Sequence, residues 1–359
     1  MRAAILFETG SQTLTVRDDV TVDEPGPGQV RIRIRATGVC HSDLSAMTGV
    51  LPQPVPFVPG HEGAGEIVAV GEGVTQVAVG DHVIICWNPP CGECADCRRG
   101  EGNLCVDIFF GMTFQPHFKL DGADVYGFAG SGTFAEELVV PWQCAVKLPD
   151  DVPFEVGALL GCGVTTGVGA VLNTAQVRPG SSVAVIGAGG VGISVIQGAR
   201  IAGAAEIVAI DPVASKHAAA LRFGATRAVT PEDAEAAKAE VAGKAGFDYV
   251  FEVVGRSALV QQAYALTRRG GTVTVVGAGK NDDVVNFNMF QLFFDNKRIL
   301  GSYYGGADPR GEYGRLIALW RAGRLDLAGM ITARLKLDDI NQALDLLRSG
   351  EAIRTIIEV

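Results

Sequence analysis

The chain has 359 residues, of which 48% are hydrophobic and 19% are charged, so it carries enough apolar side chains to bury a large core. This composition excludes a mainly disordered protein, and the length predicts two domains. The 30 Lys and Arg residues against 40 Asp and Glu residues give a net charge of −10, which repels phosphate backbones and excludes nucleic acid as a partner.

The pattern along the chain predicts a cytoplasmic protein with no membrane segment. We find no apolar run of the roughly 18 residues needed to cross a bilayer, and Glu8 lies where the apolar region of a signal peptide would run. Because the cytosol keeps thiols reduced, the eight cysteines are interpreted as metal ligands or free thiols.

The first 150 residues read as strands and turns. Residues 29–36 alternate apolar and charged side chains, which predicts a strand with one buried face. Four prolines within residues 51–60 exclude a helix there and predict an extended loop. Further strands are expected at residues 65–70, 82–87 and 136–140.

From about residue 154 the pattern changes to that of a parallel sheet. Short apolar runs at residues 182–186, 206–210, 248–253 and 272–276 alternate with Ala-rich segments of helical period. Near the end we expect two amphipathic helices and a last strand at residues 353–359; the apolar helix positions are Leu316, Leu319, Trp320, Ile340, Ala343, Leu344 and Leu347.

A glycine-rich turn joins the first of these parallel strands to a helix. Gly187, Gly189 and Gly192 form the pattern G-x-G-x-x-G, with Gly190 and Val191 between the last two. The first glycine allows a tight turn, the second lets the backbone approach a pyrophosphate, and the third lets the helix pack on the strand. Asp211 ends the next strand, where a carboxylate accepts hydrogen bonds from ribose hydroxyls and repels a 2′-phosphate. The segment therefore predicts an NAD-binding site.

Four cysteines lie within 15 residues, at Cys91, Cys94, Cys97 and Cys105. Four thiolates at this spacing match a closed, tetrahedral structural zinc site. Two disulfides or an iron–sulfur cluster are the alternatives, and the ligand count alone does not exclude the cluster.

A second set of metal-binding side chains is dispersed over three glycine-containing turns. Cys40, His61 and Cys162 are two soft sulfur ligands and one imidazole, the donor set of a catalytic zinc whose fourth position is open. Taken singly, each residue could equally be part of the core. Spacing alone does not bring these turns together.

The chain resembles the zinc-containing alcohol dehydrogenases of the medium-chain dehydrogenase/reductase superfamily over essentially its whole length. The segments G-V-C-H-S-D, G-H-E-G-A-G, the four-cysteine lobe, G-C-G-V-T-T-G, G-A-G-G-V-G and the C-terminal I-R-T-I occur in family order. The resemblance implies an α/β fold with a GroES-like β-rich catalytic domain at residues 1–160, completed by a tail at residues 302–359. A Rossmann domain with a doubly wound parallel sheet would occupy residues 161–301.

The resemblance also implies roles for individual residues. Cys40, His61 and Cys162 match the catalytic zinc ligands, Asp43 and Glu62 match carboxylates behind the metal, and Ser42 matches the hydroxyl that takes the alcohol proton. The positions that match cofactor contacts are His41, Thr166, Gly187, Gly189, Gly190, Val191, Gly192, Asp211, Lys216, Gly277 and Arg354. The implied cofactors are NAD and two zinc ions per chain.

One position departs from the family. Many relatives have a histidine three residues after the relay hydroxyl, and this chain has Ser45 there. A hydroxyl passes a proton along hydrogen bonds but does not store it near neutral pH, so water or His41 would finish the relay. Trp87 falls near the family's substrate pocket, with Leu51, Phe110 and Tyr303 as weaker candidates, and such aromatic walls favour hydrophobic alcohols.

The sequence thus predicts an NAD-dependent zinc enzyme that oxidises a primary, hydrophobic or aromatic alcohol and reduces the aldehyde in reverse. The alternatives are a thiol-dependent formaldehyde dehydrogenase acting on S-hydroxymethyl adducts, and a quinone reductase-like or regulatory NAD-binding protein without catalytic zinc. The expected partners are the small-molecule substrate and a second copy of the chain, as a homodimer or a homotetramer.

Overall fold

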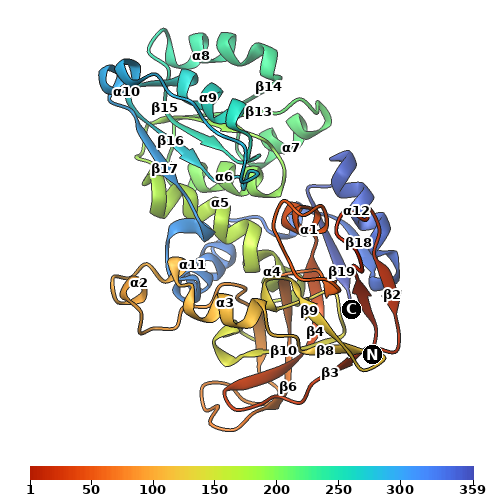
Figure 1. The fold of residues 1–359 in the computed structure, drawn as a ribbon. Helices are drawn as coiled ribbons and strands as arrows, with labels where there is room; N and C mark the ends of the chain where they lie inside the picture. Colours follow the sequence, from red (N-terminus) through yellow and green to blue (C-terminus); the bar gives the residue numbers. More distant parts are fainter. The chain divides into compact units, whose positions relative to one another are not determined.

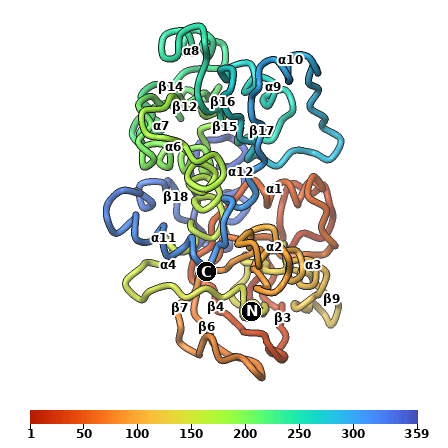
Figure 2. The backbone as a smooth tube through the Cα atoms, turned by 90° about the vertical axis from the view of Figure 1, so that its left-hand side faces the viewer, coloured from red at the N-terminus to blue at the C-terminus, as the bar shows by residue number.

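The computed structural model describes residues 1–359 as two compact units (Figure 1). Unit 1 contains Met1–Cys162, Asp308–Ala318 and Leu327–Val359, and unit 2 contains Gly163–Ala307 and Leu319–Asp326. Both ends of the chain lie in unit 1 (Figure 2).

The tail differs from the expected division. The whole segment 302–359 was expected in the first domain, but residues 302–307 and Leu319–Asp326 belong to unit 2. The side-chain amide of Gln197 exchanges two hydrogen bonds with the backbone of Asp326, at 2.8 and 3.3 Å, and Arg200 donates to the carbonyl of Arg324 at 2.7 Å. Leu319 and Trp320 therefore belong to a different unit from the buried Leu316.

Unit 1 is built on a seven-stranded sheet. Its order is β11 (Ala145–Lys147), β7 (His82–Ile85), β6 (Glu62–Val70), β4 (Gln29–Gly38), β19 (Arg354–Glu358) and β18 (Ile331–Lys336), and β10 (Glu137–Pro141) also pairs with β4. The alternating apolar residues of β4, among them Ile32 and Ile34, are buried as the pattern predicts. The last strand, β19, pairs with β4 so that Ile356 lies opposite Gly38.

Shorter elements surround this sheet. The strands are β1 (Ala3–Ile5), β2 (Thr15–Arg17), β3 (Thr21–Val22), β5 (Phe57–Val58), β8 (Phe118–Leu120) and β9 (Ala123–Gly127). The helices are α1 (His41–Met47), α2 (Ala95–Arg98), α3 (Asp107–Thr113), α4 (Phe154–Leu159), α11 (Pro309–Arg321) and α12 (Ile340–Ser349), and the last three residues of α11 belong to unit 2. The proline-rich segment 51–60 contains no helix, as expected, and two of its residues form strand β5.

Unit 2 is built on a six-stranded parallel sheet. Its order is β14 (Arg227–Val229), β13 (Glu206–Ile210), β12 (Ser182–Ile186), β15 (Phe247–Glu252), β16 (Thr267–Val275) and β17 (Arg298–Gly301). The helices are α5 (Thr165–Gly169), α6 (Gly190–Ile201), α7 (Ser215–Phe223), α8 (Ala234–Ala242), α9 (Ser257–Leu266) and α10 (Met289–Asp295). Helices α8, α9 and α10 lie on one side of the sheet and α5, α6 and α7 on the other (Figure 1). This order and layering confirm a doubly wound Rossmann-type sheet.

One helical stretch corrects the expectation that no segment is long and apolar enough to cross a membrane. Phe154–Ala175 meets both criteria, and Glu155 is its one charged residue. However, 83% of its most apolar window is buried inside the protein, as in a core helix. Length and composition alone are therefore weak grounds for a membrane segment here.

Candidate active site and metal centres

The short helix α1 begins at a capping box. Cys40 is the N-cap residue, and the Asp43 carboxylate accepts a hydrogen bond from the Cys40 backbone N–H at 2.9 Å. The other Asp43 oxygen accepts from the Gly60 N–H at 3.0 Å and lies 3.1 Å from His61 Nδ1. One buried carboxylate therefore joins the turn that holds Cys40 to the turn that holds His61.

These turns form the first of two clusters of metal-binding side chains. One ligand atom from each of Cys40, His61, Glu62 and Cys162 lies within 4.8 Å of the others, and all four residues are buried. Cys162 reaches the cluster from a π-helical turn, Leu160–Val164, a type of helix defect that often accompanies functional sites. His61 Nε2 is buried without a hydrogen-bond partner, so its lone pair is free to coordinate.

The electrostatics of this cluster suit a dication. Hydrogen bonding to Cys162 is the main cause that holds the pKa of Cys40 well below its usual range, and His61 and Arg354 contribute in the same direction. Burial alone lowers the pKa of His61. The opposite effect of Asp43 and Cys40 is larger, so the pKa is raised to about 10. A zinc ion would take over the role of that proton, and two sulfurs with one imidazole fit zinc chemically.

Glu62 lies closer to the cluster than sequence reasoning implied. It begins strand β6, pairs in register with Gly38 of β4, and forms a buried ion pair with Arg354. A Cβ at Gly38 would collide with the Glu62 carboxylate, so glycine is required beside this pair. Arg354 was expected at the cofactor pyrophosphate; the structure pairs it with Glu62, and a phosphate contact stays a prediction.

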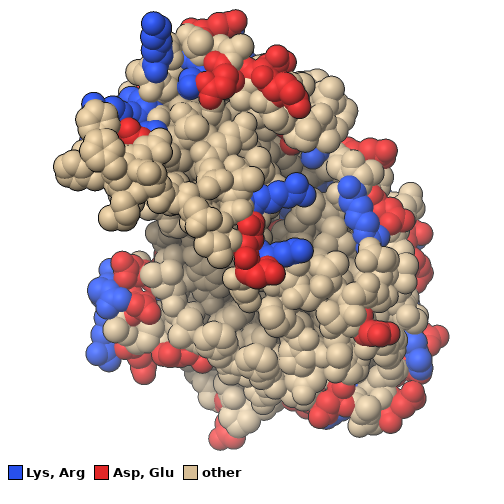
Figure 3. All heavy atoms as spheres, turned by 45° about the horizontal axis from the view of Figure 1, so that its top comes forward, with Lys and Arg blue, Asp and Glu red and all other residues tan.

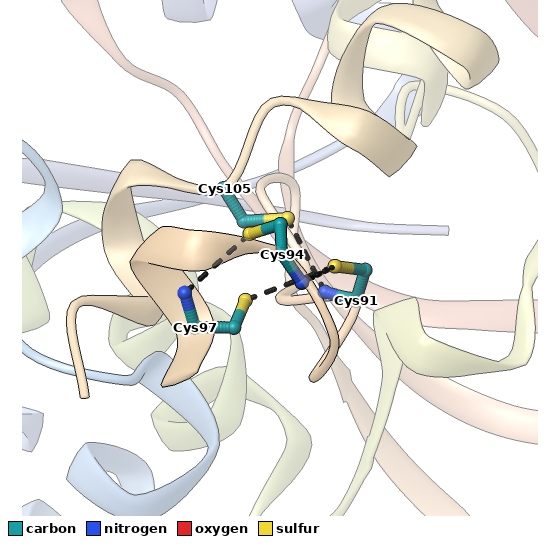
Figure 4. A group of neighbouring side chains, drawn as sticks. All are labelled: Cys91, Cys94, Cys97 and Cys105. Atoms are coloured by element: carbon teal, nitrogen blue, oxygen red, sulfur yellow. Dashed lines mark hydrogen bonds between the residues drawn. The ribbon is translucent and has the colours of Figure 1, made fainter. Parts of the chain in front are cut away.

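The second cluster gathers the sulfurs of Cys91, Cys94, Cys97 and Cys105, which also lie within 4.8 Å of one another (Figure 4). The 3.9 Å between the Cys91 and Cys97 sulfurs matches the edge of about 3.8 Å in a tetrahedron with 2.3 Å zinc–sulfur bonds. Backbone N–H groups of Cys91, Cys94 and Cys97 donate to sulfurs of the cluster at 3.2 to 3.4 Å. None of the eight cysteines forms a disulfide, which argues against the two-disulfide alternative. The donor set fits a closed zinc site.

The glycine-rich turn follows strand β12 in unit 2. Gly187 has a φ of +103°, which favours glycine, and a Cβ at Gly192 would collide with the carbonyl oxygen of Gly187. A Cβ at Gly189 would meet open space, so the backbone there is accessible at the start of helix α6. This is a cradle that fits the pyrophosphate of a dinucleotide.

Asp211 is buried at the end of β13 and contacts this turn. Its two oxygens accept from the backbone N–H groups of Ala188 at 2.8 Å and Val213 at 2.9 Å, and Lys216 Nζ lies 3.7 Å away. Asp211 therefore caps backbone groups as well as carrying the charge predicted to face the ribose.

An apolar, aromatic wall adjoins the first cluster. The rings of Trp87 and Phe128 lie edge-on to the His61 ring, at 6.2 and 5.2 Å between centroids. Phe109 packs against Trp87 at 6.0 Å and against Phe110 at 5.6 Å. Sequence reasoning found Trp87 and Phe110 but missed Phe109 and Phe128, for which the only signal was the aromatic content of the segment after Cys105.

The remaining predicted residues lie as follows. His41 and Ser42 begin helix α1, and Ser42 Oγ lies 3.7 Å from Cys40 Sγ. Leu51 packs on the unit 1 core, whereas Thr166, Gly277 and the 45% exposed Tyr303 belong to unit 2. The metal ligands all belong to unit 1. Of the residues predicted to contact the cofactor, His41 and Arg354 also belong to unit 1, and the others belong to unit 2.

Known proteins resemble this chain in sequence and in structure. Residues 26–150 match the family described as alcohol dehydrogenase GroES-like domain, and residues 190–321 match the family described as zinc-binding dehydrogenase. An S-(hydroxymethyl)glutathione dehydrogenase from Escherichia coli is 40% identical and aligns with 99% of both chains.

Two solved structures superpose over all of this chain. Benzyl alcohol dehydrogenase from Acinetobacter calcoaceticus has a TM-score of 0.91 and 32% identity, with 99% of its own chain covered. An alcohol dehydrogenase zinc-binding domain protein from Burkholderia ambifaria has a TM-score of 0.92 and 34% identity, with 98% covered.

The fold and the two metal clusters define a zinc-dependent oxidoreductase with a dinucleotide-binding domain. The chain belongs to the zinc-containing alcohol dehydrogenases of the medium-chain dehydrogenase/reductase superfamily. It is an enzyme that uses a nicotinamide dinucleotide and two zinc ions, and the expected fold class is confirmed.

Proposed function

We propose that the enzyme oxidises primary alcohols with an apolar, often aromatic, substituent, uses NAD, and reduces the corresponding aldehydes in reverse. The observation that carries the proposal is the chain of ring contacts from His61 through Trp87 and Phe109 to Phe110, together with the contact of Phe128 with His61. Aromatic rings beside a reactive centre favour aromatic and aliphatic substituents because these leave water on binding.

The charge of the neighbouring segments supports this choice over a glutathione adduct. The tripeptide part of such an adduct carries two carboxylates, which need cationic partners when they leave water. Helix α3, which supplies Phe109 and Phe110, contains no Lys or Arg, and its charged residue is Asp107. Residues 48–58, which include Leu51, carry no charge at all.

The proposed metal sites divide the work between structure and chemistry. Cys40, His61 and Cys162 would hold the catalytic zinc, and Cys91, Cys94, Cys97 and Cys105 would hold the structural zinc. When bound, the catalytic zinc supplies a Lewis acid that lowers the pKa of an alcohol hydroxyl, and the nicotinamide supplies a hydride acceptor.

Side chains of this protein then position groups and move the proton. Asp43 fixes the His61 tautomer by accepting from Nδ1, so that Nε2 faces the cluster. The Ser42 hydroxyl, beside Cys40, accepts the alcohol proton, and His41 or water passes it on because Ser45 does not store it. The rings of Trp87 and Phe128 keep water from this side of the site.

The test is NADH formation by the purified enzyme on benzyl alcohol, 1-hexanol, ethanol, and formaldehyde with glutathione, each with NAD and with NADP. We expect kcat/KM for benzyl alcohol to exceed that for ethanol by at least about 100-fold, as burial of a phenyl ring can supply roughly 3 kcal/mol. A Trp87→Ala variant should lose more on benzyl alcohol than on ethanol. Turnover confined to formaldehyde with glutathione would move the assignment to S-hydroxymethyl adducts, and no turnover at all would favour the non-zinc alternative.

A homodimer is proposed through the open edge of the unit 2 sheet. Strand β17 pairs only with β16, and the adjoining helix α10 leaves Met289 80%, Phe290 70% and Phe293 80% exposed. An uncharged bulge at the upper left of Figure 3 lies on the side where Figure 1 has α10. Two such edges can pair about a two-fold axis, which would satisfy the free backbone groups on both copies. Light scattering after size exclusion, with Phe293→Glu as the disrupting variant, distinguishes monomer, dimer and tetramer.

A further inference from the structure

Glu252 ends the central strand β15 and is fully buried. It lies in register between Ile186 of β12 and Val275 of β16. The strand order of the sheet reverses direction between β12 and β15, and ligands of open parallel sheets bind beside the carboxyl ends of strands at such a point. Glu252 is thus in register with Ile186, the last residue of the strand that leads into the glycine-rich turn.

The carboxylate of Glu252 holds the loop that follows it. Its Oε1 accepts from the backbone N–H groups of Val254 at 2.9 Å and Gly255 at 2.7 Å. Its backbone carbonyl accepts from the N–H groups of Val276 at 2.8 Å and Gly277 at 3.1 Å. One residue therefore fixes the first residues of two consecutive loops at the carboxyl edge of the sheet.

The loop after β15 is in close contact with the loops on both sides of it. A Cβ at Gly187 would lie 2.8 Å from Val254 Cγ2 and 2.9 Å from Val253 Cγ2. A Cβ at Gly255 would lie 2.5 Å from the carbonyl oxygen of Ala278, in the loop after β16. A shift of the loop held by Glu252 would consequently displace the Gly187 turn.

The second oxygen of Glu252 shows that the residue is not optimal for stability alone. Oε2 is buried and has no hydrogen-bond partner. Burial of an unpaired acceptor costs free energy, and each such group in a native protein needs an explanation. Residues that lower stability in this way are concentrated at functional sites.

We propose that Glu252 is a positioning residue for dinucleotide binding. Through Val254 and Gly255 it keeps the loop after β15 against Gly187 and so maintains the turn that receives the pyrophosphate. The proposal rests on the dinucleotide-binding part of the proposed function and not on the identity of the alcohol.

The test measures NADH binding by fluorescence titration, without alcohol, for the wild type, Glu252→Ala, Glu252→Gln and Glu252→Asp. The alanine variant loses both hydrogen bonds, and we expect its Kd for NADH to rise about tenfold or more. The glutamine variant keeps an acceptor oxygen at the same reach, so its Kd should stay within about threefold of wild type. The shorter aspartate should give an intermediate loss, and it replaces the alanine variant in the test if that variant does not fold.

Asp248→Asn is the matched control, because Asp248 lies at the opposite, amino end of the same strand. Asp248 accepts from Ser182 N–H at 2.9 Å and pairs with Arg268 at 2.7 Å, so its loss should lower the melting temperature but leave the NADH Kd unchanged. In Glu252→Ala, KM for the dinucleotide should rise while zinc content stays at two ions per chain.

Two results would overturn the proposal: a folded Glu252→Ala variant that binds NADH as the wild type does, or an Asp248→Asn variant that loses as much affinity. Failure of the alcohol assignment is distinguishable, because an enzyme whose NADH affinity depends on Glu252 but which oxidises no apolar alcohol contradicts only the proposed substrate.

Discussion

The guanidinium of Arg354 pairs with the carboxylate of Glu62 where water reaches neither side chain, their exposed fractions being 5% and 0%. Arg354 is the first residue of β19, and Glu62 is the first residue of β6. Both strands pair with β4, and Gly38 at the end of β4 leaves room for the contact. A buried pair of this kind is sensitive to loss of either partner, because the remaining charge has no solvent.

We therefore expect Glu62→Gln to lower the free energy of unfolding by on the order of 3 kcal/mol, since Arg354 would stay buried without a counter-charge. Urea denaturation of the zinc-loaded protein measures this change. Glu66→Gln is the control, because Glu66 lies on the same strand and pairs with Arg35 near the surface, at 3.0 Å. Loss of the Glu66–Arg35 ion pair should lower the free energy of unfolding by less than about 1 kcal/mol. Equal stability of the two variants would show that the buried pair is not the sensitive one.

The cysteine lobe gives a prediction about metal content. Cys97→Ser should reduce bound zinc from two ions to one per chain and lower the melting temperature, because helix α2 in this lobe buries none of its residues and depends on the metal. Elemental analysis and thermal denaturation are the measurements. Cys144→Ala, which removes a buried thiol outside both clusters, should lower stability by packing loss but retain two zinc ions. Two zinc ions in Cys97→Ser would contradict the structural site.

Much of the fold is readable from the sequence where burial produces a simple pattern. Strands β12 and β13 have the predicted bounds, because buried parallel strands are short apolar runs between glycines and polar turns. The period-two segment at residue 29 is strand β4, extended by two residues to Gly38. Helix α1 was not predicted: it has seven residues, and its start depends on the reach of Asp43 to the Cys40 N–H.

The site is less readable because its parts meet through the sheet. Local spacing brings Cys91, Cys94, Cys97 and Cys105 into one candidate cluster, since a short loop is sufficient. The approach of Cys40 to His61 depends instead on the pairing of β4 with β6, where Gly38 lies opposite Glu62. Register over such distances follows from tertiary packing, and sequence spacing does not encode it. For the same reason the contact of Arg354 with Glu62 was missed.

Asp211 accepts from two backbone N–H groups and is predicted to face the ribose of the dinucleotide, and two substitutions test these roles. Asp211→Asn removes the charge that repels a 2′-phosphate, so the ratio of kcat/KM for NAD to that for NADP should fall about tenfold or more. Asp211→Asn keeps one acceptor oxygen, for one of the two backbone N–H groups. Asp211→Ala leaves both the Ala188 and the Val213 N–H without this acceptor, and should weaken the binding of both dinucleotides more strongly. Steady-state kinetics with each dinucleotide provide the ratio.

Glu206→Gln is the control for Asp211, because Glu206 lies at the other end of the same strand β13 and contacts Thr226. In Glu206→Gln, the ratio of kcat/KM for NAD to kcat/KM for NADP should equal that of wild type. An unchanged ratio in Asp211→Asn as well would mean that Asp211 serves only as a cap.

His117 makes stability depend on pH. Its ring is buried, Nε2 lies 3.2 Å from the Ser131 carbonyl oxygen, and burial lowers its pKa from 6.5 to about 4. Between these values the unfolded chain binds a proton that the folded protein does not, so stability present above pH 6.5 is lost as the pH falls toward 4. A shift of this size corresponds to on the order of 3 kcal/mol at most.

The comparison that isolates this effect is the free energy of unfolding of wild type and His117→Gln from pH 7.5 to 5. The variant should be less stable at pH 7.5, because its amide packs less well against Phe118 and Gly127. Since glutamine does not titrate, the stability difference should shrink as the pH falls through about 6. A difference independent of pH would mean that His117 is protonated in the folded protein as readily as in the unfolded chain. Because burial lowers the pKa of His117, the free energy of unfolding of wild type should fall more steeply with decreasing pH than that of the variant.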